Sequence, residues 1–352
     1  PGSPYTYDVR LFDDDDPAMK GSAFTPVELA AMGPPPDPPE DGNRFNDVNK
    51  RLVIRATGFG PRGTQATFEQ MLIPMVMPAL LVGGDVAIAN VVQVTGPRGS
   101  VHANGDLTIS GTSVTIAQSA TATGTISADT AWHPGGLESG DMPRIPVPDI
   151  HAADYFADAD YVLQADGRIT NPPVTTVYCD ASATADACRD ITPPGGTAPF
   201  GWVFDAASGW NLSQDSANSA TYYARTNVRI TASPGTPVSP VLLTIIAEGD
   251  IEITGNPNLR PEPASELQFV TDRDLRISGS PGVPLTLEGR FLVREQIDLS
   301  GEATLVGQVI VQDVASLGPL VVSNTITGGV TLSYNGSVET VTYTVSGWRE
   351  VP

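Results

Sequence analysis

The stretch AEGDIEITG at residues 247–255 decides how the chain is interpreted, because four other segments repeat its pattern. A glycine or polar residue opens each copy, apolar and polar residues then alternate, and glycine or asparagine closes it. The alternation, as at Ile251 and Ile253, places two apolar side chains on one face of a short β-strand. A closing glycine permits the positive φ that a tight corner often needs. The other copies are GGDVAIAN (83–90), NGDLTISG (104–111), DRDLRISG (272–279) and REQIDLSG (294–301).

The spacing of the copies indicates stacked coils. Gly84 and Gly105 are 21 residues apart, and Gly249, Arg273 and Glu295 are separated by 24 and 22 residues. Short strands and corners that repeat at this period are typical of a parallel β-solenoid, in which each coil buries its inner face against the next. Right-handed winding is expected from the handedness of parallel crossovers. An antiparallel sandwich is the alternative, but two-residue hairpin signals between paired strands are sparse.

The repeated pattern also predicts which side chains point inward. The second apolar residue of each copy occupies an equivalent place in its coil and should face the interior. Charged residues between the apolar pair, Glu252, Arg276 and Asp298, should alternate on the outer face. The predicted inward residues are Ile88, Ile109, Ile253, Ile277 and Leu299.

Residues 1–78 differ from the remainder and predict a separate β domain. Three strands are expected at 5–12, 51–60 and 66–77, the last two joined in a hairpin by GPRGTQ. The long Pro-rich connection between the first two strands contains TPVELAAMG (25–33), which predicts a short helix with a threonine N-cap and a glycine stop.

Residues 79–352 are assigned to the solenoid. Coils are expected from about residue 80 to 129 and again from 241 to 338. The segment at about 130–235 breaks the pattern, and we interpret it as an insertion that covers one side or end of the solenoid. A final alternating strand is expected at 341–351.

Composition limits the classes of function. The 352 residues include 40 Asp and Glu against 19 Lys and Arg, a formal net charge of −21, which disfavours general nucleic-acid binding because phosphates would be repelled. No run of 18 apolar residues is present to span a membrane, and no signal peptide is found. The opening PGSPYT is typical of a cloning scar, so we expect the natural protein to start earlier.

The two cysteines, Cys179 and Cys188, enclose small polar residues and match no zinc-binding spacing. In a Ser- and Thr-rich acidic chain this arrangement predicts a local disulfide, and therefore an oxidising compartment. Two free thiols in a cytosolic protein are the alternative.

The most concentrated acidic group lies at residues 13–16, and more oxygen donors follow at the far end of the same loop. Adjacent carboxylates repel one another, and calcium relieves this with six to eight oxygen ligands. The candidate calcium ligands are Asp13, Asp14, Asp15, Asp16, Asp41, Asn43 and Asp47. A solvated acidic loop is the alternative, since the spacing does not match an EF-hand. No other cofactor is predicted.

No catalytic residues are predicted. The GxSxG, HExxH and Walker motifs are absent, and so are the Gly-His-Gly and Arg-x-Lys motifs typical of solenoid pectinases. His102, His133 and His151 stand in unrelated contexts, and His102 is expected at the surface beside a corner. The aromatic group Trp202, Trp210, Tyr222 and Tyr223 is interpreted as core of the insertion, with sugar stacking as the alternative.

Three segments together resemble a known family: YDVRLFDDDDP (7–17), NKRLVIRATGFGPRGTQATFEQML (49–72) and SGWREV (346–351), with the repeated strands between them. The chain is similar to large minor pilins of type IV pili, in particular PilX-type proteins whose pilin-like sheet carries a β-solenoid. ComZ, a minor pilin of DNA-uptake pili, has a related plan. The prepilin leader and long apolar N-terminal helix of that family are missing here.

The resemblance implies a structural protein at or near the pilus tip that helps to initiate assembly and presents the solenoid outward. It implies contacts with other minor pilins, the major pilin and a PilY-type tip adhesin, an extracellular location, and membrane association only through the missing helix. A secreted carbohydrate-binding or carbohydrate-active β-solenoid is the alternative.

Overall fold

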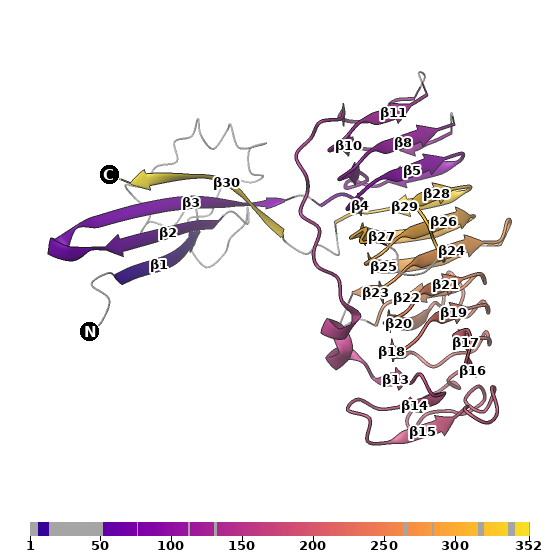
Figure 1. The fold of residues 1–352 in the computed structure, drawn as a ribbon. Helices are drawn as coiled ribbons and strands as arrows, with labels where there is room; N and C mark the ends of the chain where they lie inside the picture. The colour runs from indigo at the N-terminus through magenta and orange to yellow at the C-terminus, as the bar shows by residue number, and fades with distance from the viewer. Residues whose placement is uncertain are drawn as a thin grey trace. The chain divides into compact units, whose positions relative to one another are not determined.

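The computed structural model describes residues 6–13, 52–75, 77–111, 113–129, 132–262, 266–283, 285–315, 320–336 and 342–351. The protein is mostly β, with 46% strand and 4% helix. It divides into two compact units, Pro1–Met77 with Thr340–Pro352, and Pro78–Glu339. Figure 1 shows the strands of both units.

The first unit contains a four-stranded antiparallel sheet, which we call sheet A. Its order is β1-β2-β3-β30. The hairpin predicted around GPRGTQ is present, and its turn uses positive φ at Arg62 and Gly63. The strands are β1 (Thr6–Asp13), β2 (Leu52–Phe59), β3 (Gln65–Met75) and β30 (Thr342–Val351). The helix predicted at 25–33 lies outside the described residues.

The second unit is a β-solenoid of about ten turns, as the repeated pattern predicts. Two long parallel sheets form its walls, and we call them sheets B and C (Figure 1). A typical coil contributes one strand to sheet C and two strand stretches to sheet B, as with β5 (Val86–Ala89) between β4 (Leu80–Val82) and β6 (Val92–Thr95). Alternating side chains bury one face of many of the strands, as in β5, β8 (Leu107–Ser110) and β24 (Leu275–Gly279), so the two sheets enclose a single apolar core.

The chain builds this solenoid as two arrays. The first array comprises residues 79–141. Its strands in sheet B are β4 (Leu80–Val82), β6 (Val92–Thr95), β7 (Val101–Ala103), β9 (Thr115–Ile116), β10 (Ala120–Ala122) and β12 (Glu138–Ser139). Its strands in sheet C are β5 (Val86–Ala89), β8 (Leu107–Ser110) and β11 (Ile126–Ala128).

The second array, residues 161–336, starts at the opposite end of the stack and winds back towards the first. In sheet B it has β13 (Tyr161–Leu163), β14 (Arg168–Thr170), β15 (Val177–Asp180), β18 (Ala220–Ala224), β20 (Val241–Ala247), β22 (Asn258–Arg260), β23 (Leu267–Thr271), β25 (Thr286–Val293) and β27 (Thr304–Val311). In sheet C it has β16 (Trp202–Asp205), β17 (Gly209–Leu212), β19 (Val228–Ile230), β21 (Ile251–Ile253), β24 (Leu275–Gly279), β26 (Ile297–Gly301) and β28 (Thr325–Thr327), and β29 (Val330–Ser333) completes it.

The last coil of the second array stacks on the first coil of the first array. The pairs β27–β4, β28–β5 and β29–β6 are all parallel. We call this junction the seam. Residues 142–160, which we call the strap, run along the outside of the solenoid between the far ends of the two arrays (Figure 1). The strap contains the 3-10 helix η3 (Ala152–Asp158).

The structure therefore divides the chain differently from the sequence-based domain assignment. Residues 161–230, expected in an insertion at 130–235, supply strands to both solenoid sheets. The final strand, β30, pairs with β3 of sheet A and not with the solenoid. The repeated strand pattern does not identify these coils, because aromatic residues and longer loops replace it in this segment.

The predicted inward residues form one continuous ladder. Ile253, Ile277 and Leu299 are direct register neighbours. Ile326 of β28 then connects Leu299 to Ile88, the first predicted member in the other array. Ile109 follows Ile88. All five predicted residues are at most 2% exposed, so the prediction of an inward ladder is confirmed, and the seam makes the ladder unbroken.

Candidate functional surfaces

One face of sheet A is apolar and exposed. Tyr7, Val9 and Leu11 alternate along β1 and have exposed fractions of 83%, 56% and 60%. Val9 pairs with Ala56 of β2, which pairs with the partly exposed Phe68 of β3, so the apolar row continues across the sheet. A contiguous apolar surface of this kind marks a contact site for another apolar element.

The opposite face of sheet A is buried over β2 and β3, while the side chains of Arg10 and Asp8 of β1 on the same face are exposed. Val53 and Glu69 are 1% and 0% exposed. Arg55 Nε donates to Glu69 Oε1 at 2.5 Å, which provides the pairing that a buried carboxylate requires. Sheet A thus has one face with an exposed apolar row and an opposite face that is polar along β1 and partly buried.

The predicted calcium ligands cannot be placed in this structure. Asp13 ends β1, and its side chain is not described. The others, Asp14, Asp15, Asp16, Asp41, Asn43 and Asp47, lie outside the described residues. Within the described ranges, no group of three or more His, Cys, Asp or Glu residues is arranged to hold a metal ion.

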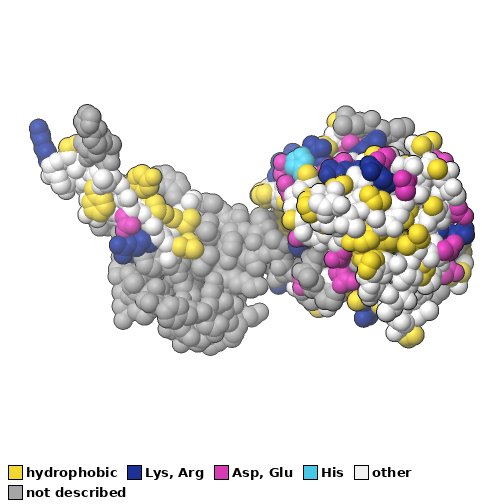
Figure 2. All heavy atoms as spheres, turned by 90° about the horizontal axis from the view of Figure 1, so that it is seen from below, with side chains coloured by type: hydrophobic (Ala, Val, Ile, Leu, Met, Phe, Trp, Pro, Cys, Tyr) yellow, Lys and Arg dark blue, Asp and Glu magenta, His cyan; other side chains and the backbone are white. Residues whose placement is uncertain are grey.

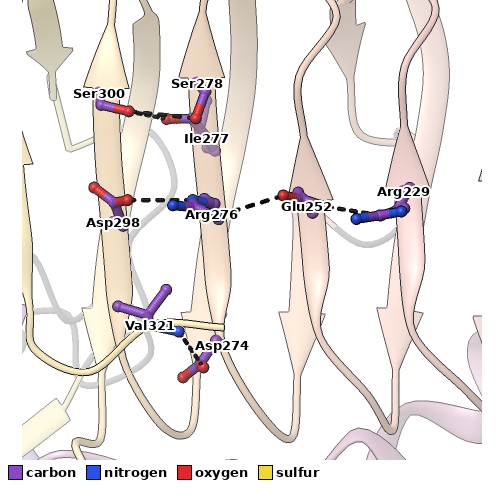
Figure 3. A network of polar contacts seen from close by, with 9 residues as sticks. All are labelled: Arg229, Glu252, Asp274, Arg276, Ile277, Ser278, Asp298, Ser300 and Val321. Carbon is purple, nitrogen blue, oxygen red and sulfur yellow. Dashed lines mark hydrogen bonds and ion pairs between the residues drawn. The ribbon is translucent and has the colours of Figure 1, made fainter. Parts of the chain in front are cut away.

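A row of alternating charges follows the outer face of sheet C (Figure 3). Arg229 Nε donates to Glu252 Oε2 at 2.7 Å. Arg276 lies between two carboxylates, with Nη1 3.6 Å from Glu252 Oε1 and Nε 3.3 Å from Asp298 Oδ2. The predicted alternation of Glu252, Arg276 and Asp298 is confirmed. Since neighbouring charges offset one another, the row supports coil stacking and leaves little unpaired charge for a partner.

A column of polar side chains lies at the turns that precede sheet C. Asn227 Oδ1 accepts the backbone N–H of Asp250 at 2.9 Å, and Asp250 Oδ1 accepts that of Asp274 at 3.3 Å. Asp274 Oδ1 then accepts the N–H of Gln296 at 3.0 Å. Each side chain thereby satisfies a turn donor of the next coil.

The same device recurs in the first array. Asp85 Oδ1 accepts the N–H of Asp106, and Asp106 Oδ1 accepts that of Thr125, both at 2.7 Å. These aspartates are not among the functional residues predicted from the sequence. The repeated segment does indicate such a role, because an aspartate follows the opening residues in four of its five copies.

Asp274 is the most perturbed carboxyl of the column. Its burial raises its pKa to about 6. Burial also raises the pKa of Asp250, while Arg273, with Nε 3.5 Å from Asp250 Oδ1, opposes that rise. Asp274 Oδ2 accepts the N–H of Val321 at 2.8 Å, which ties a neighbouring loop to the turn (Figure 3).

The far end of the second array is a cap made of antiparallel strands. β14 and β15 pair antiparallel, and so do β16 and β17. Cys179 of β15 is bonded to Cys188 with the Cα atoms 5.4 Å apart, so the predicted disulfide is confirmed. Figure 2 looks onto this end, where hydrophobic side chains gather among charged ones. Val174, Val177 and Ile191 are 45%, 50% and 41% exposed there.

The four aromatic residues for which sugar stacking was the alternative are buried. Trp202, Trp210 and Tyr222 lie in the core, whereas Tyr223 packs against Phe156 of the strap. Trp202, Trp210, Tyr222 and Tyr223 are each 0% exposed. Trp202 meets Tyr222 edge to face with ring centroids 5.3 Å apart. Trp202, Trp210 and Tyr222 fill coils of the second array.

The histidines are scattered, and one prediction about them was wrong. His102, expected at the surface, is 2% exposed in β7. It contacts Thr121 Oγ1 at 2.8 Å and Asn104 Oδ1 at 3.2 Å, and burial lowers its pKa. His133 and His151 contact the carboxylates of Glu138 and Asp149 near the surface.

Comparison with known proteins leaves the family of the chain open. No protein-family model matches it, and no curated protein matches it. Among solved structures, the competence-associated pilin ComZ from Thermus thermophilus is similar over 88% of this chain and 82% of that chain, with 11% identity and a TM-score of 0.37. At that TM-score the likeness carries no conclusion about function. Among the described residues, no helix combines the length and apolar character of a membrane span.

Proposed function

We propose that the chain is the head of a minor pilin of a type IV pilus. In this proposal sheet A joins the head to the pilus, and the solenoid is presented outward at or near the tip. Its partners are other minor pilins, the major pilin and a PilY-type tip adhesin, and its location is extracellular. The role is structural, in assembly and in contact with a surface or partner.

The apolar face of sheet A is the observation that carries this proposal. Tyr7, Val9 and Leu11 form a row that suits the side of an apolar α-helix, such as the N-terminal helix implied by the sequence resemblance. The connectivity also supports a role for sheet A in attachment and for the solenoid in outward presentation. The chain passes from β3 into the solenoid and returns to β30 beside β3, so the solenoid is carried as an excursion from sheet A.

Substitutions on the two faces of β1 test the proposal. In cells that carry the natural full-length gene, Val9→Asp with Leu11→Asp should abolish incorporation of the protein into pili, because two carboxylates would disrupt an apolar contact. The matched control, Asp8→Ser with Arg10→Ser, changes the other face of the same strand and should leave incorporation unchanged. Pilus preparations probed for the protein give the readout.

Normal incorporation of the Val9 and Leu11 variant, with normal pilus number, would contradict the proposal. Secretion of the unaltered protein as a free species that binds polysaccharide would favour the carbohydrate-related alternative.

A further inference from the structure

The seam joins two coils that are distant in sequence. Its backbone hydrogen bonds run in both directions across the junction. Val309 N–H donates to the carbonyl of Ala79, and Gly83 N–H to that of Val311, each at 2.8 Å. Side chains continue the contact, since Gln308 Nε2 donates to the carbonyl of Pro78 at 3.0 Å.

The seam differs from the regular coil interfaces inside the arrays in how the chain crosses it. Inside an array, successive coils are joined by a turn, so separating them requires a coil to unwind. At the seam no turn joins the two coils, because the chain passes from the first array to the second only through the strap. Outside the solenoid, β3 leads into the first array and β30 follows the second, and these two strands pair in sheet A. The arrays can therefore separate here without a change of backbone torsion inside either one.

The strap is anchored on both sides of the seam. In the first array, Asn104 Nδ2 donates to the carbonyl of Ile145 at 2.7 Å, and its Oδ1 accepts the Ile145 N–H at 2.8 Å. In the second array, Gln312 Oε1 accepts the N–H of Ile150 at 3.1 Å, and Asp272 Oδ1 accepts that of Ala152 at 2.7 Å. Residues 146–148, with the sequence PVP, connect the two anchored stretches.

We propose that the seam is a joint at which the solenoid opens as a unit. The first array undocks from the second with the coils of both intact, and the strap keeps the two tethered so that the joint closes again. This is local opening along a cooperative boundary, set by the path of the chain and independent of the function proposed above.

Two glycines offer matched probes of the joint. A Cβ at Gly83 would lie 2.1 Å from the carbonyl oxygen of Gln312, across the seam. A Cβ at Gly105 would lie 2.1 Å from Asp85 Oδ1, inside the first array. Neither glycine has positive φ, so alanine at each site tests the contact alone.

Amide hydrogen exchange of the unaltered protein, followed by NMR, is the first test. The amides that donate across the seam, Gly83, Ala87 and Val309, should share one opening free energy. They should exchange about tenfold or more faster than amides that donate within an array, such as Val101 and Gln312. Equal protection of the two sets would overturn the proposal.

The glycine variants give the second test. Gly83→Ala should further reduce protection of the seam amides and leave Val101 and Gln312 protected. Gly105→Ala should reduce protection within the first array, including Val101. A uniform loss of protection throughout both arrays in Gly83→Ala would show that the solenoid is one cooperative unit and that no joint exists.

Discussion

Asn324 Nδ2 donates to the backbone carbonyl of Asp85 at 2.9 Å, although the two residues are 239 positions apart. The same amide nitrogen lies 2.8 Å from Asp313 Oδ1, and Asn324 Oδ1 accepts the N–H of Ile297 at 3.1 Å. One buried side chain thus connects three coils at the seam. A buried polar residue with all its groups paired favours one register over others, because a shifted register would leave those groups unpaired.

The inward ladder predicts a strong asymmetry between adjacent residues. Ile277→Asp should lower the free energy of unfolding by several kcal/mol, because it buries an unpaired carboxylate at a position that is 0% exposed. Arg276→Ser, the neighbouring control on the outer face, should cost about 1 kcal/mol or less, as exposed ion pairs contribute little. Denaturant unfolding followed by circular dichroism measures both. Comparable losses would contradict the assignment of the two faces.

Removing the disulfide should loosen the cap more than the solenoid. Replacing both Cys179 and Cys188 with alanine should reduce stability by about 2 to 3 kcal/mol, the chain-entropy effect of a short closed loop. Limited proteolysis should then cut first within residues 171–201. Mass spectrometry of the unreduced protein provides the check on the bond itself, and two free thiols would refute it.

Asp274 should make stability fall as the pH rises. Its pKa is about 6 in the folded protein and 3.8 ordinarily, so between about pH 4 and pH 6 the folded state binds more protons than the unfolded state. The stabilisation from this group is therefore fully present below about pH 4 and is lost through pH 6. Asp274→Asn should flatten the dependence in that window.

Unfolding free energies at several values between pH 4 and pH 7 measure this effect. Asp205 provides a contrast of opposite sign, because hydrogen bonds from Ser208 lower its pKa. Asp205→Asn should leave the window above pH 4 unaffected. If the Asp274→Asn variant keeps the same slope of unfolding free energy against pH, the raised pKa of Asp274 is contradicted.

Calcium binding by the acidic loop stays a prediction from sequence. Millimolar calcium should raise the melting temperature and a chelator should lower it, since a ligand that binds only the folded state stabilises that state. Asp14→Asn with Asp15→Asn should remove the response, while magnesium at the same concentration serves as the control ion. A melting temperature that ignores calcium would leave the solvated-loop interpretation in place.

The alternation at Ile253, Ile277 and Leu299 was sufficient to predict parallel stacking, because residue spacing and the period of a strand are both local properties. The link through Ile326 could not be predicted in this way. Its segment, NTITGG at 324–329, carries one apolar residue where the other copies carry two. The pairing at the seam depends on which coils distant in sequence come together. Local periodicity does not determine that pairing.

The error at His102 has its physical origin in the strap. His102 lies in a strand whose outer face would be at the surface of an uncovered coil, but the strap passes over the neighbouring Asn104 and binds it. For the apolar face of sheet A, the alternation of Tyr7, Val9 and Leu11 predicted a strand. Which side would stay exposed depended on packing that the pattern does not encode.

Because the chain joins and leaves the solenoid at the seam, both ends of the stack are free of the connections to sheet A. Whole coils can therefore be added or lost at either terminus of the stack without disturbing the attachment. Adding coils at one end of the stack requires no change other than a longer strap. The number of coils is therefore independent of the connection to sheet A. Related or engineered proteins can vary in solenoid length while sheet A and the seam remain constant.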